Sequence, residues 1–267
     1  MTKPFGDWFW EKSAALYSSA KRVVMRGPFI SHEGHSFIYK VPALANMGDD
    51  CEQGTRSPLL VFEDEQLLSS PHTSHDYIIH HGKGAYSHWQ DQLYFSSSDG
   101  SSPNENGRTY SYICSEAAYL EAFTKELEGV RHYFMAGPFS EGEGHCFSYT
   151  IPQPIALTFG ALSDTDAARQ STLVVFEDGL PLIGPHASHA YIANVGNGAH
   201  SHWLEQICFS SSDGTSPQSN GRQYTFTTSR NVYTALFSEK IGKHLHYLMH
   251  RPFVAQDDGS YAFQIPK

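Results

Sequence analysis

The 267-residue sequence predicts a mainly β protein in which an antiparallel β-sandwich or jelly-roll-like module occurs twice in tandem, with short connecting helices. Two observations carry this prediction. The same sequence blocks recur at a constant spacing, and short apolar segments bounded by turn residues fill each copy. Regular alternation of short strands and turns favours antiparallel sheets over a parallel βαβ arrangement.

The repeat is clearest in two longer bodies. Both contain VFED, PHxSH, GxGxxSHW and FSSSDGxSPxxNGRxY, and His88 and Arg108 recur 114 positions later as His202 and Arg222. This period exceeds the roughly 20–50 residues of solenoid and propeller repeats, so each copy should fold around its own core.

Three related lead-in segments begin at Arg22, Arg131 and Leu245 and bracket the two bodies. The final lead-in is expected to complete the sheet of the second body, and the middle lead-in offers the same possibility for the first. The predicted organisation is an N-terminal helix (1–20), a first β module with its connecting helix (21–128), a second such module (129–242) and a partial third lead-in (243–267).

Periodicity places the individual elements. Strands are predicted at 37–41, 59–62, 93–95 and 109–113, because these segments are short and rich in β-branched or aromatic residues. Helices are predicted at 115–127, with Ser115 as N-cap, and at 229–241, because apolar residues recur there on one helical face. A helix around 7–20 fits the pattern less cleanly.

The charge and the apolar content of the chain limit the classes of partner that it is expected to bind. The chain is 40% hydrophobic and has a net charge of −10 with no Lys/Arg-rich run, so a globular protein is expected and a nucleic-acid surface is not. No segment approaches the roughly 20 apolar residues that span a bilayer, and no secretory signal is recognisable, which predicts a soluble, cytoplasmic protein without membrane insertion. A homo-oligomer is possible.

The four cysteines do not form a recognisable framework. Cys51, Cys114, Cys146 and Cys208 each fall where the other copy has a different residue, and no CxxC pair occurs. Neither a disulfide framework nor a structural zinc site is therefore expected.

Each body carries a histidine trio, and the two trios are His72, His75 and His88, and His186, His189 and His202. Neutral imidazoles bind metals and exchange hydrogen bonds near neutral pH. A His-x-x-His pair in a loop followed by a third His fits a transition-metal ligand set for zinc, nickel or iron. A polar ligand pocket and the capping of loops remain equally open, and no other cofactor is expected.

A tryptophan follows the third histidine in both bodies, at Trp89 and Trp203. The C–H face of a sugar ring stacks on an indole while neighbouring polar groups bond its hydroxyls, so Ser-His-Trp is typical of a sugar platform. Packing of the indole in an aromatic core explains the motif equally well.

The long polar loop of each body begins with an aspartate and ends with an arginine, at Asp99 and Arg108 and at Asp213 and Arg222. These side chains could form an ion pair that pins a hairpin loop, or a donor and acceptor fork for a ligand. The neighbouring Glu63-Asp64 pair most simply marks a strand that turns out of the core, because adjacent strand residues point to opposite faces.

The motif string resembles a β-rich accessory module associated with bacterial methyltransferases and glycosyltransferases that act on sugars. The resemblance covers residues 57–112 and 171–226 and implies no activity of the module itself. No transferase domain accompanies the modules in this chain.

These observations favour a non-catalytic, lectin-like protein that binds carbohydrate or glycoconjugates at two similar sites. Each site is expected to combine the histidine trio, the tryptophan, the loop aspartate and the following arginine. A metal-dependent enzyme using three histidines per module and a structural or assembly scaffold are the alternatives. GxSxG is absent and no cysteine is shared by both copies, so nucleophilic catalysis has little support.

Overall fold

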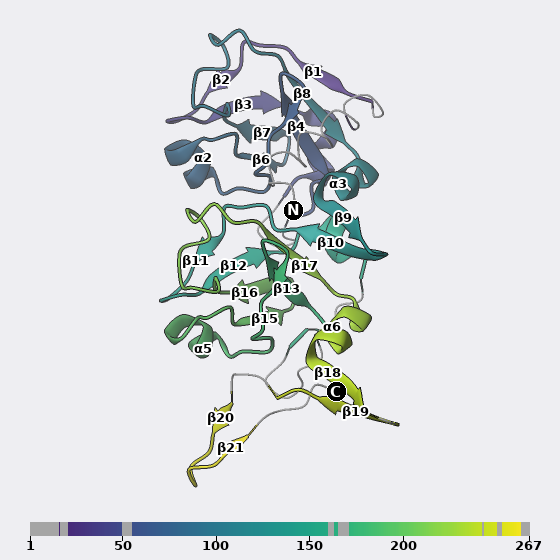
Figure 1. The fold of residues 1–267 in the computed structure, drawn as a ribbon. Coiled ribbons are helices and arrows are strands. Elements are labelled where there is room, and N and C mark those ends of the chain that lie inside the picture. The colour runs from purple at the N-terminus through teal and green to yellow at the C-terminus, as the bar shows by residue number, and fades with distance from the viewer. Residues whose placement is uncertain are drawn as a thin grey trace. The chain divides into compact units, whose positions relative to one another are not determined.

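The structure is a computed structural model that describes Leu16 and residues 21–49, 55–159, 163–164, 171–241, 243–249 and 253–262. The chain divides into two compact units near residue 124, with residues 136–138 and 152–158 belonging to the first unit. We call these units module 1 and module 2 (Figure 1). The helix predicted around 7–20 lies outside the described residues, apart from Leu16.

Module 1 is a sandwich of two four-stranded antiparallel sheets, as the sequence predicted. The first sheet has the order β1 (Val23–Met25), β8 (Tyr110–Cys114), β4 (Leu59–Glu63), β5 (Gln66–Leu67). The second has the order β2 (Ile30–Ser31), β3 (Phe37–Lys40), β7 (Gln92–Phe95), β6 (Tyr86–Trp89). Val61 of the first sheet and Phe95 of the second belong to one buried cluster, so the core lies between the sheets.

Module 2 repeats this architecture. Its first sheet has the order β14 (Leu180–Pro181), β13 (Val174–Glu177), β17 (Tyr224–Thr227), β10 (Val130–Phe134), β9 (Thr124–Leu127). Its second has the order β11 (Ser140–Glu141), β12 (Phe147–Thr150), β16 (Gln206–Phe209), β15 (His200–Trp203). Every pairing within these sheets that the structure describes is antiparallel.

The described strands of the middle and third lead-ins pair differently from the expectation that each lead-in completes the sheet of the preceding body. The middle lead-in supplies β10, which pairs with β17 of the second body. In the third lead-in, β19 (His244–Tyr247) pairs with β18 (Ser238–Ile241), and β20 (Val254–Ala255) pairs with β21 (Tyr261–Ala262). The expected pairing position is already filled in each body. β1 lies beside β8 in the first body, and β10 lies beside β17 in the second.

The connecting helices begin where predicted and end earlier. Helix α3 (Glu116–Phe123) has the Ser115 side chain as its N-cap acceptor, and α6 (Arg230–Phe237) has Ser229 in the same role. Each helix gives way directly to a strand, β9 or β18, so the predicted ends at 127 and 241 are too late. Two short helical segments, η1 (Pro42–Met47) and α4 (Gln153–Ala156), follow the first and middle lead-ins.

Two further helices begin at the ends of the His-x-x-His segments, which were expected to lie in loops. Helix α2 (His75–His81) and helix α5 (His189–Asn194) begin at the second histidine of each trio. The preceding Ser74 and Ser188 accept the N-cap hydrogen bond in each case. Helices of six or seven residues contain too few turns for their apolar period to be recognised in the sequence.

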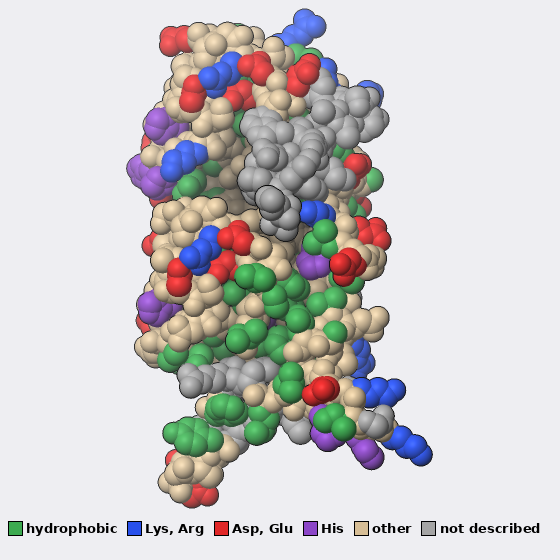
Figure 2. All heavy atoms as spheres, viewed as in Figure 1, with side chains coloured by type: hydrophobic (Ala, Val, Ile, Leu, Met, Phe, Trp, Pro, Cys, Tyr) green, Lys and Arg blue, Asp and Glu red, His purple; other side chains and the backbone are tan. Residues whose placement is uncertain are grey.

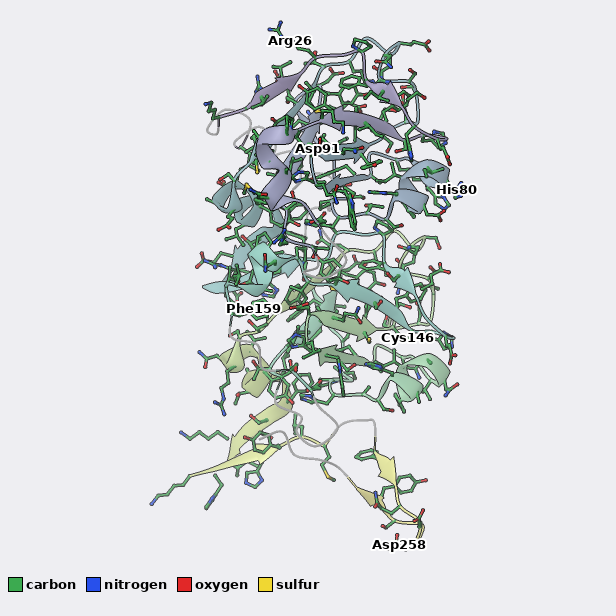
Figure 3. All side chains as sticks on the ribbon, turned by 180° about the vertical axis from the view of Figure 1, so that it is seen from behind. Arg26, His80, Asp91, Cys146, Phe159 and Asp258 are labelled. Carbon is green, nitrogen blue, oxygen red and sulfur yellow. The ribbon has the colours of Figure 1, made fainter. Side chains whose placement is uncertain are left out.

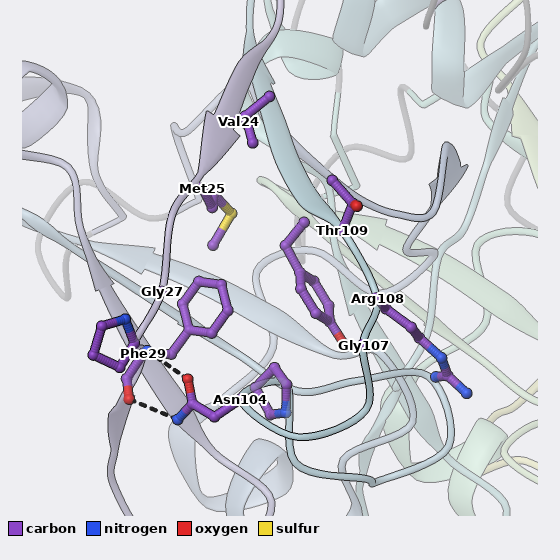
Figure 4. A pocket seen from close by; sticks show the side chains of 11 residues that line it. Val24, Met25, Gly27, Phe29, Asn104, Gly107, Arg108 and Thr109 are labelled. Carbon is purple, nitrogen blue, oxygen red and sulfur yellow. Dashed lines mark hydrogen bonds between the residues drawn. The ribbon is translucent and has the colours of Figure 1, made fainter.

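An amide side chain fixes each of the first two lead-ins to the long loop of its own module. Asn104 Oδ1 accepts from the Phe29 backbone N–H at 2.7 Å, and Asn104 Nδ2 donates to the Phe29 carbonyl at 2.9 Å (Figure 4). Gln218 makes the same two bonds to Phe139, both at 2.8 Å. The long loop therefore acts as a clamp on the segment between β1 and β2 in module 1 and between β10 and β11 in module 2.

Replacement of Asn104 by alanine should destabilise module 1 by about 1–3 kcal/mol, because it leaves the Phe29 backbone groups without these partners. Denaturant unfolding with amide hydrogen exchange at Phe29 measures the effect. Gln218→Ala is the matched control and should accelerate exchange at Phe139 instead. Equal loss of protection in both modules from either substitution would contradict a clamp that acts within one module.

Candidate functional site

Strand alternation divides the Ser-His-Trp motif between the two faces of its sheet. In β6, Tyr86 and His88 lie opposite Phe95 and Leu93 of β7, and both histidine and tyrosine are buried. Successive strand residues point to opposite faces, so Ser87 and Trp89 lie on the outer face of the same sheet. His88 therefore belongs to the interior of the sandwich and Trp89 to its outside.

A buried polar network occupies the interior side. His72 Nδ1 lies 2.9 Å from an oxygen of Asp49, and His72 Nε2 lies 2.9 Å from the Tyr119 hydroxyl of α3. The Ser57 backbone N–H donates to Asp49 at 3.0 Å, and its hydroxyl lies 2.8 Å from His88 Nδ1. One chain of hydrogen bonds thus links two of the three predicted histidines. Burial lowers the pKa of His88 and favours its neutral form.

Module 2 contains the same network. His186 bridges Asp164 at 2.7 Å and the Tyr233 hydroxyl at 2.8 Å, and the Ser171 hydroxyl lies 2.9 Å from His202 Nδ1. Burial raises the pKa of Asp164, but the hydrogen bond and charge of His186 outweigh it, so the pKa lies below that of an ordinary carboxyl group. The repetition shows that the network is part of the module.

The network holds its first histidine in an uncommon backbone conformation. His72 and His186 have φ values of 55° and 58°, in the left-handed region that non-glycine residues seldom adopt. In both, the two ring nitrogens are engaged by a carboxylate and a tyrosine hydroxyl. Among the residues that the structure describes, no group of three or more His, Cys, Asp or Glu is arranged to hold a metal ion.

The outer face of module 1 presents an aromatic surface at the start of α2. The His75 ring stacks on Tyr94 at 3.9 Å and meets Trp89 edge-on, with ring centroids 5.9 Å apart. His75 Nε2 also lies 3.5 Å from the Ser87 hydroxyl. Gln92 lies directly across the strand pair from Trp89. We call the group His75, Ser87, Trp89, Gln92 and Tyr94 the outer-face site of module 1.

Polar groups border this site. Lys40 of β3 lies opposite Gln92 and forms an ion pair with Asp91, with Lys40 Nζ 3.2 Å from the carboxylate. Figure 3 labels Asp91 and also His80, which lies on α2. Burial and the nearby His32 lower the pKa of His75, so its imidazole is neutral at pH 7. A neutral imidazole has one donor and one acceptor nitrogen.

The outer-face site of module 2 consists of His189, Ser201, Trp203, Gln206 and Cys208. His189 and Trp203 keep the edge-on contact, with ring centroids 5.9 Å apart, and Gln206 again lies across from the tryptophan. Cys208 lies opposite Ser201 in module 2. The equivalent pair in module 1 is Tyr94 and Ser87. The indole, imidazole, hydroxyl and amide are therefore common to both modules.

The loop aspartate and arginine form a separate group with a buried glutamate. Arg108 pairs with Asp99 and with Glu63, whose Oε1 lies 3.2 Å from Nη1. Glu63 also accepts from the Tyr110 hydroxyl at 2.7 Å and bonds the Ser98 hydroxyl. The hydrogen bond from Arg108 holds the pKa of Asp99 well below its usual range. Figure 2 shows a basic side chain flanked by acidic ones over this loop in each module.

The same arrangement links Arg222 to Asp213 and Glu177 in module 2. Burial raises the pKa of Glu177, yet its hydrogen bonds with Ser212 and Tyr224 bring the pKa below its ordinary value. A cavity of about 520 Å³ lies beside the loop of module 1, and Arg108 is among its lining residues, but the Arg108 guanidinium points away from Phe29 and Asn104 on the other side (Figure 4). The arginine thus serves the loop network.

The structure therefore sorts the predicted ligand residues into three groups. The second histidine and the tryptophan of each body meet on the outer face, the first and third histidines support the interior, and the aspartate and arginine pin the loop. Sequence reasoning did not identify Asp49 and Asp164, which lie in segments that differ between the copies. It also missed Gln92 and Gln206, although their repetition in both copies was a usable signal.

Comparison of the chain with protein families, curated proteins and solved structures finds no match. Within the described ranges, no helix has the length and apolar character needed to cross a membrane. The geometry of the two modules is therefore the basis of the functional proposal.

His200, which follows Ala199 and points into the interior of module 2, allows the effect of burial on a histidine pKa to be tested. His200 of β15 is fully buried, and burial lowers its pKa to about 4, whereas an unfolded histidine has a pKa near 6.5. Between these values the unfolded state binds more protons, so the free energy of unfolding of module 2 should fall by about 2–3 kcal/mol as the pH falls from 6.5 to 4.

The equivalent position in module 1 is Tyr86, so His200→Tyr is a matched variant. Urea unfolding of both proteins between pH 4 and 7 measures the effect. The variant should lose this part of the pH dependence of module 2. If the free energy of unfolding changed with pH by the same amount in both proteins, His200 would not have the lowered pKa that its burial requires.

Proposed function

We propose that this chain is a non-catalytic carbohydrate-binding protein with one ligand site in each module. The observation that carries the proposal is the pairing of a partly exposed tryptophan with an edge-on histidine at the same 5.9 Å in both modules. The outer-face sites are the proposed ligand-binding surfaces. In this proposal the indole face stacks on the C–H face of a sugar ring.

The neighbouring polar groups have the chemistry that sugar hydroxyls require. A glutamine amide, the neutral His75 imidazole of module 1 and a serine hydroxyl each combine donor and acceptor capacity, as a sugar hydroxyl group does. The glutamine and the buried serine project from the sheet and the imidazole begins a short helix, so none of them lies on a long loop and few side chains must be ordered when a ligand binds. This arrangement favours an uncharged polar ligand.

The proposal assigns supporting roles to the other predicted residues. His72 and His88, with Asp49, hold the strand and turn from which Trp89 and His75 project. Asp99 and Arg108 hold the long loop against Glu63. Because these side chains bind one another, they are not proposed as ligand contacts.

Duplication of the site is consistent with a polymeric or clustered glycan. Two weak sites on one chain can raise the apparent affinity for such a ligand without any new contact, provided that both sites can be engaged together. A small free sugar would gain nothing from the second site.

The test is a glycan array probed with the full chain, followed by titration calorimetry on the best glycan. Trp89→Ala and Trp203→Ala should each weaken binding at one site by about tenfold or more, or ~1.4 kcal/mol, because stacking is lost. The double variant should abolish binding.

Trp89→Phe is the matched control, since it keeps an aromatic face and should retain most of the binding. Arg108→Lys tests whether the arginine belongs to the loop network and not to the ligand site. This variant should leave the affinity for the glycan unchanged. Binding that survives the double tryptophan variant, or that depends on Arg108 instead, would refute the outer-face sites. A full chain that binds no glycan would favour the scaffold alternative.

A further inference from the structure

Two cysteines meet on the outer face of module 2. Cys208 of β16 lies directly opposite Ser148 of β12, and Cys146 is two residues before Ser148, so both cysteines project from the same face of the sheet. Cys146 packs against the buried cluster that contains Cys208, Ile192 and Ala199. Figure 3 labels Cys146 near α5.

The two thiols differ in accessibility and acidity. Cys146 is partly exposed, whereas Cys208 is buried. A hydrogen bond from the Cys208 thiol lowers the pKa of Cys146 to about 7, although partial burial acts in the opposite direction. The same interaction, with burial, raises the pKa of Cys208. A partly exposed thiol of low pKa reacts first with an oxidant, and a neighbouring thiol then resolves the product.

We propose that Cys146 and Cys208 form a peroxide-sensitive pair that closes into a reversible disulfide within module 2. The Cys146 thiolate attacks one oxygen of hydrogen peroxide, the O–O bond breaks, and a sulfenic acid and hydroxide result. The Cys208 sulfur, after losing its proton to hydroxide, attacks the Cys146 sulfur and displaces its hydroxyl group as hydroxide. With protons balanced, two thiols and one peroxide give one disulfide and two water molecules.

Module 1 serves as a comparison for module 2, because it lacks both of these cysteines. Module 1 has Ser36 and Tyr94 at the equivalent positions, so only module 2 can close such a bond. Disulfide formation needs Cα atoms within about 7 Å, and diagonal neighbours on paired strands lie near that limit. Cys146 lies in the turn between β11 and β12, where a small backbone shift can shorten the separation.

The position of the pair connects it with the outer-face site. Cys208 lies across the strand pair from Ser201, and the cluster around it includes Ile192 of α5, the helix that begins with His189. Closure of the disulfide would therefore change the packing beneath α5. The redox chemistry itself does not depend on the proposed carbohydrate function.

Peptide mapping of the full chain tests the proposal directly. The reduced protein is exposed to hydrogen peroxide at low protein concentration, blocked with N-ethylmaleimide and digested with trypsin without reduction. Cleavage after Lys and Arg places the two cysteines in separate peptides, 132–169 and 170–222. The expected result is a cross-link between these two peptides in most molecules, which dithiothreitol reverses.

Variants separate the roles of the two thiols. Cys208→Ser should stop the reaction at a Cys146 sulfenic acid that dimedone traps, and Cys146→Ser, the residue found in module 1, should leave Cys208 reduced. Cys114→Ser is the matched control and should not change the yield. Cross-links of equal abundance to the Cys51 or Cys114 peptides, links only between chains, or Cys146 sulfinic acid beside reduced Cys208 would overturn the proposal.

Discussion

Side chains alternate between the two faces of a β-strand, and this constraint divides the repeated Ser-His-Trp motif in both modules. His88 and His202 turn inward and join hydrogen-bond networks that include Ser57 and Ser171. In both modules the flanking tryptophan turns outward and meets edge-on the histidine that begins the adjacent helix, and in module 1 the Ser87 hydroxyl also lies near that histidine. Three residues adjacent in the sequence thus serve two purposes: the inward histidine stabilises the module, and the outward tryptophan contributes a partly exposed aromatic surface next to a buried serine.

The two modules act as natural controls for each other. Their shared groups are the Asp–His–Tyr network, the Glu–Asp–Arg loop network and the pairing of histidine with tryptophan. Their differences include two positions with distinct chemistry: Tyr86 against His200, and Tyr94 against Cys208. Shared features explain why the fold can occur twice in one chain. The differences make module 2 the one that carries the redox-active pair and the interior histidine of lowered pKa.

Much of the fold follows from local sequence, because the β-sandwich class, strands such as β3 and β4, and the Ser115 cap all depend on short-range patterns. Pairing partners did not follow, since the lead-ins are alike and only the three-dimensional structure shows that β10 joins β17. The sequence predicted residues of the candidate site, such as the second histidine and the tryptophan, but not which residues lie together in the structure. His72 and Asp49 are 23 positions apart, and their contact depends on how η1 and the turn before α2 pack. Periodicity carries no information about such a contact.

The central claim is that each histidine trio is split, with only its second member on the outer face. Modification by diethyl pyrocarbonate, followed residue by residue by mass spectrometry, measures the accessibility of individual imidazoles. We expect His75 and His189 to react readily in the native protein, while His72, His88, His186 and His202 react only after unfolding. Comparable rates for all six histidines would contradict the split and would restore the trio as a single accessible site.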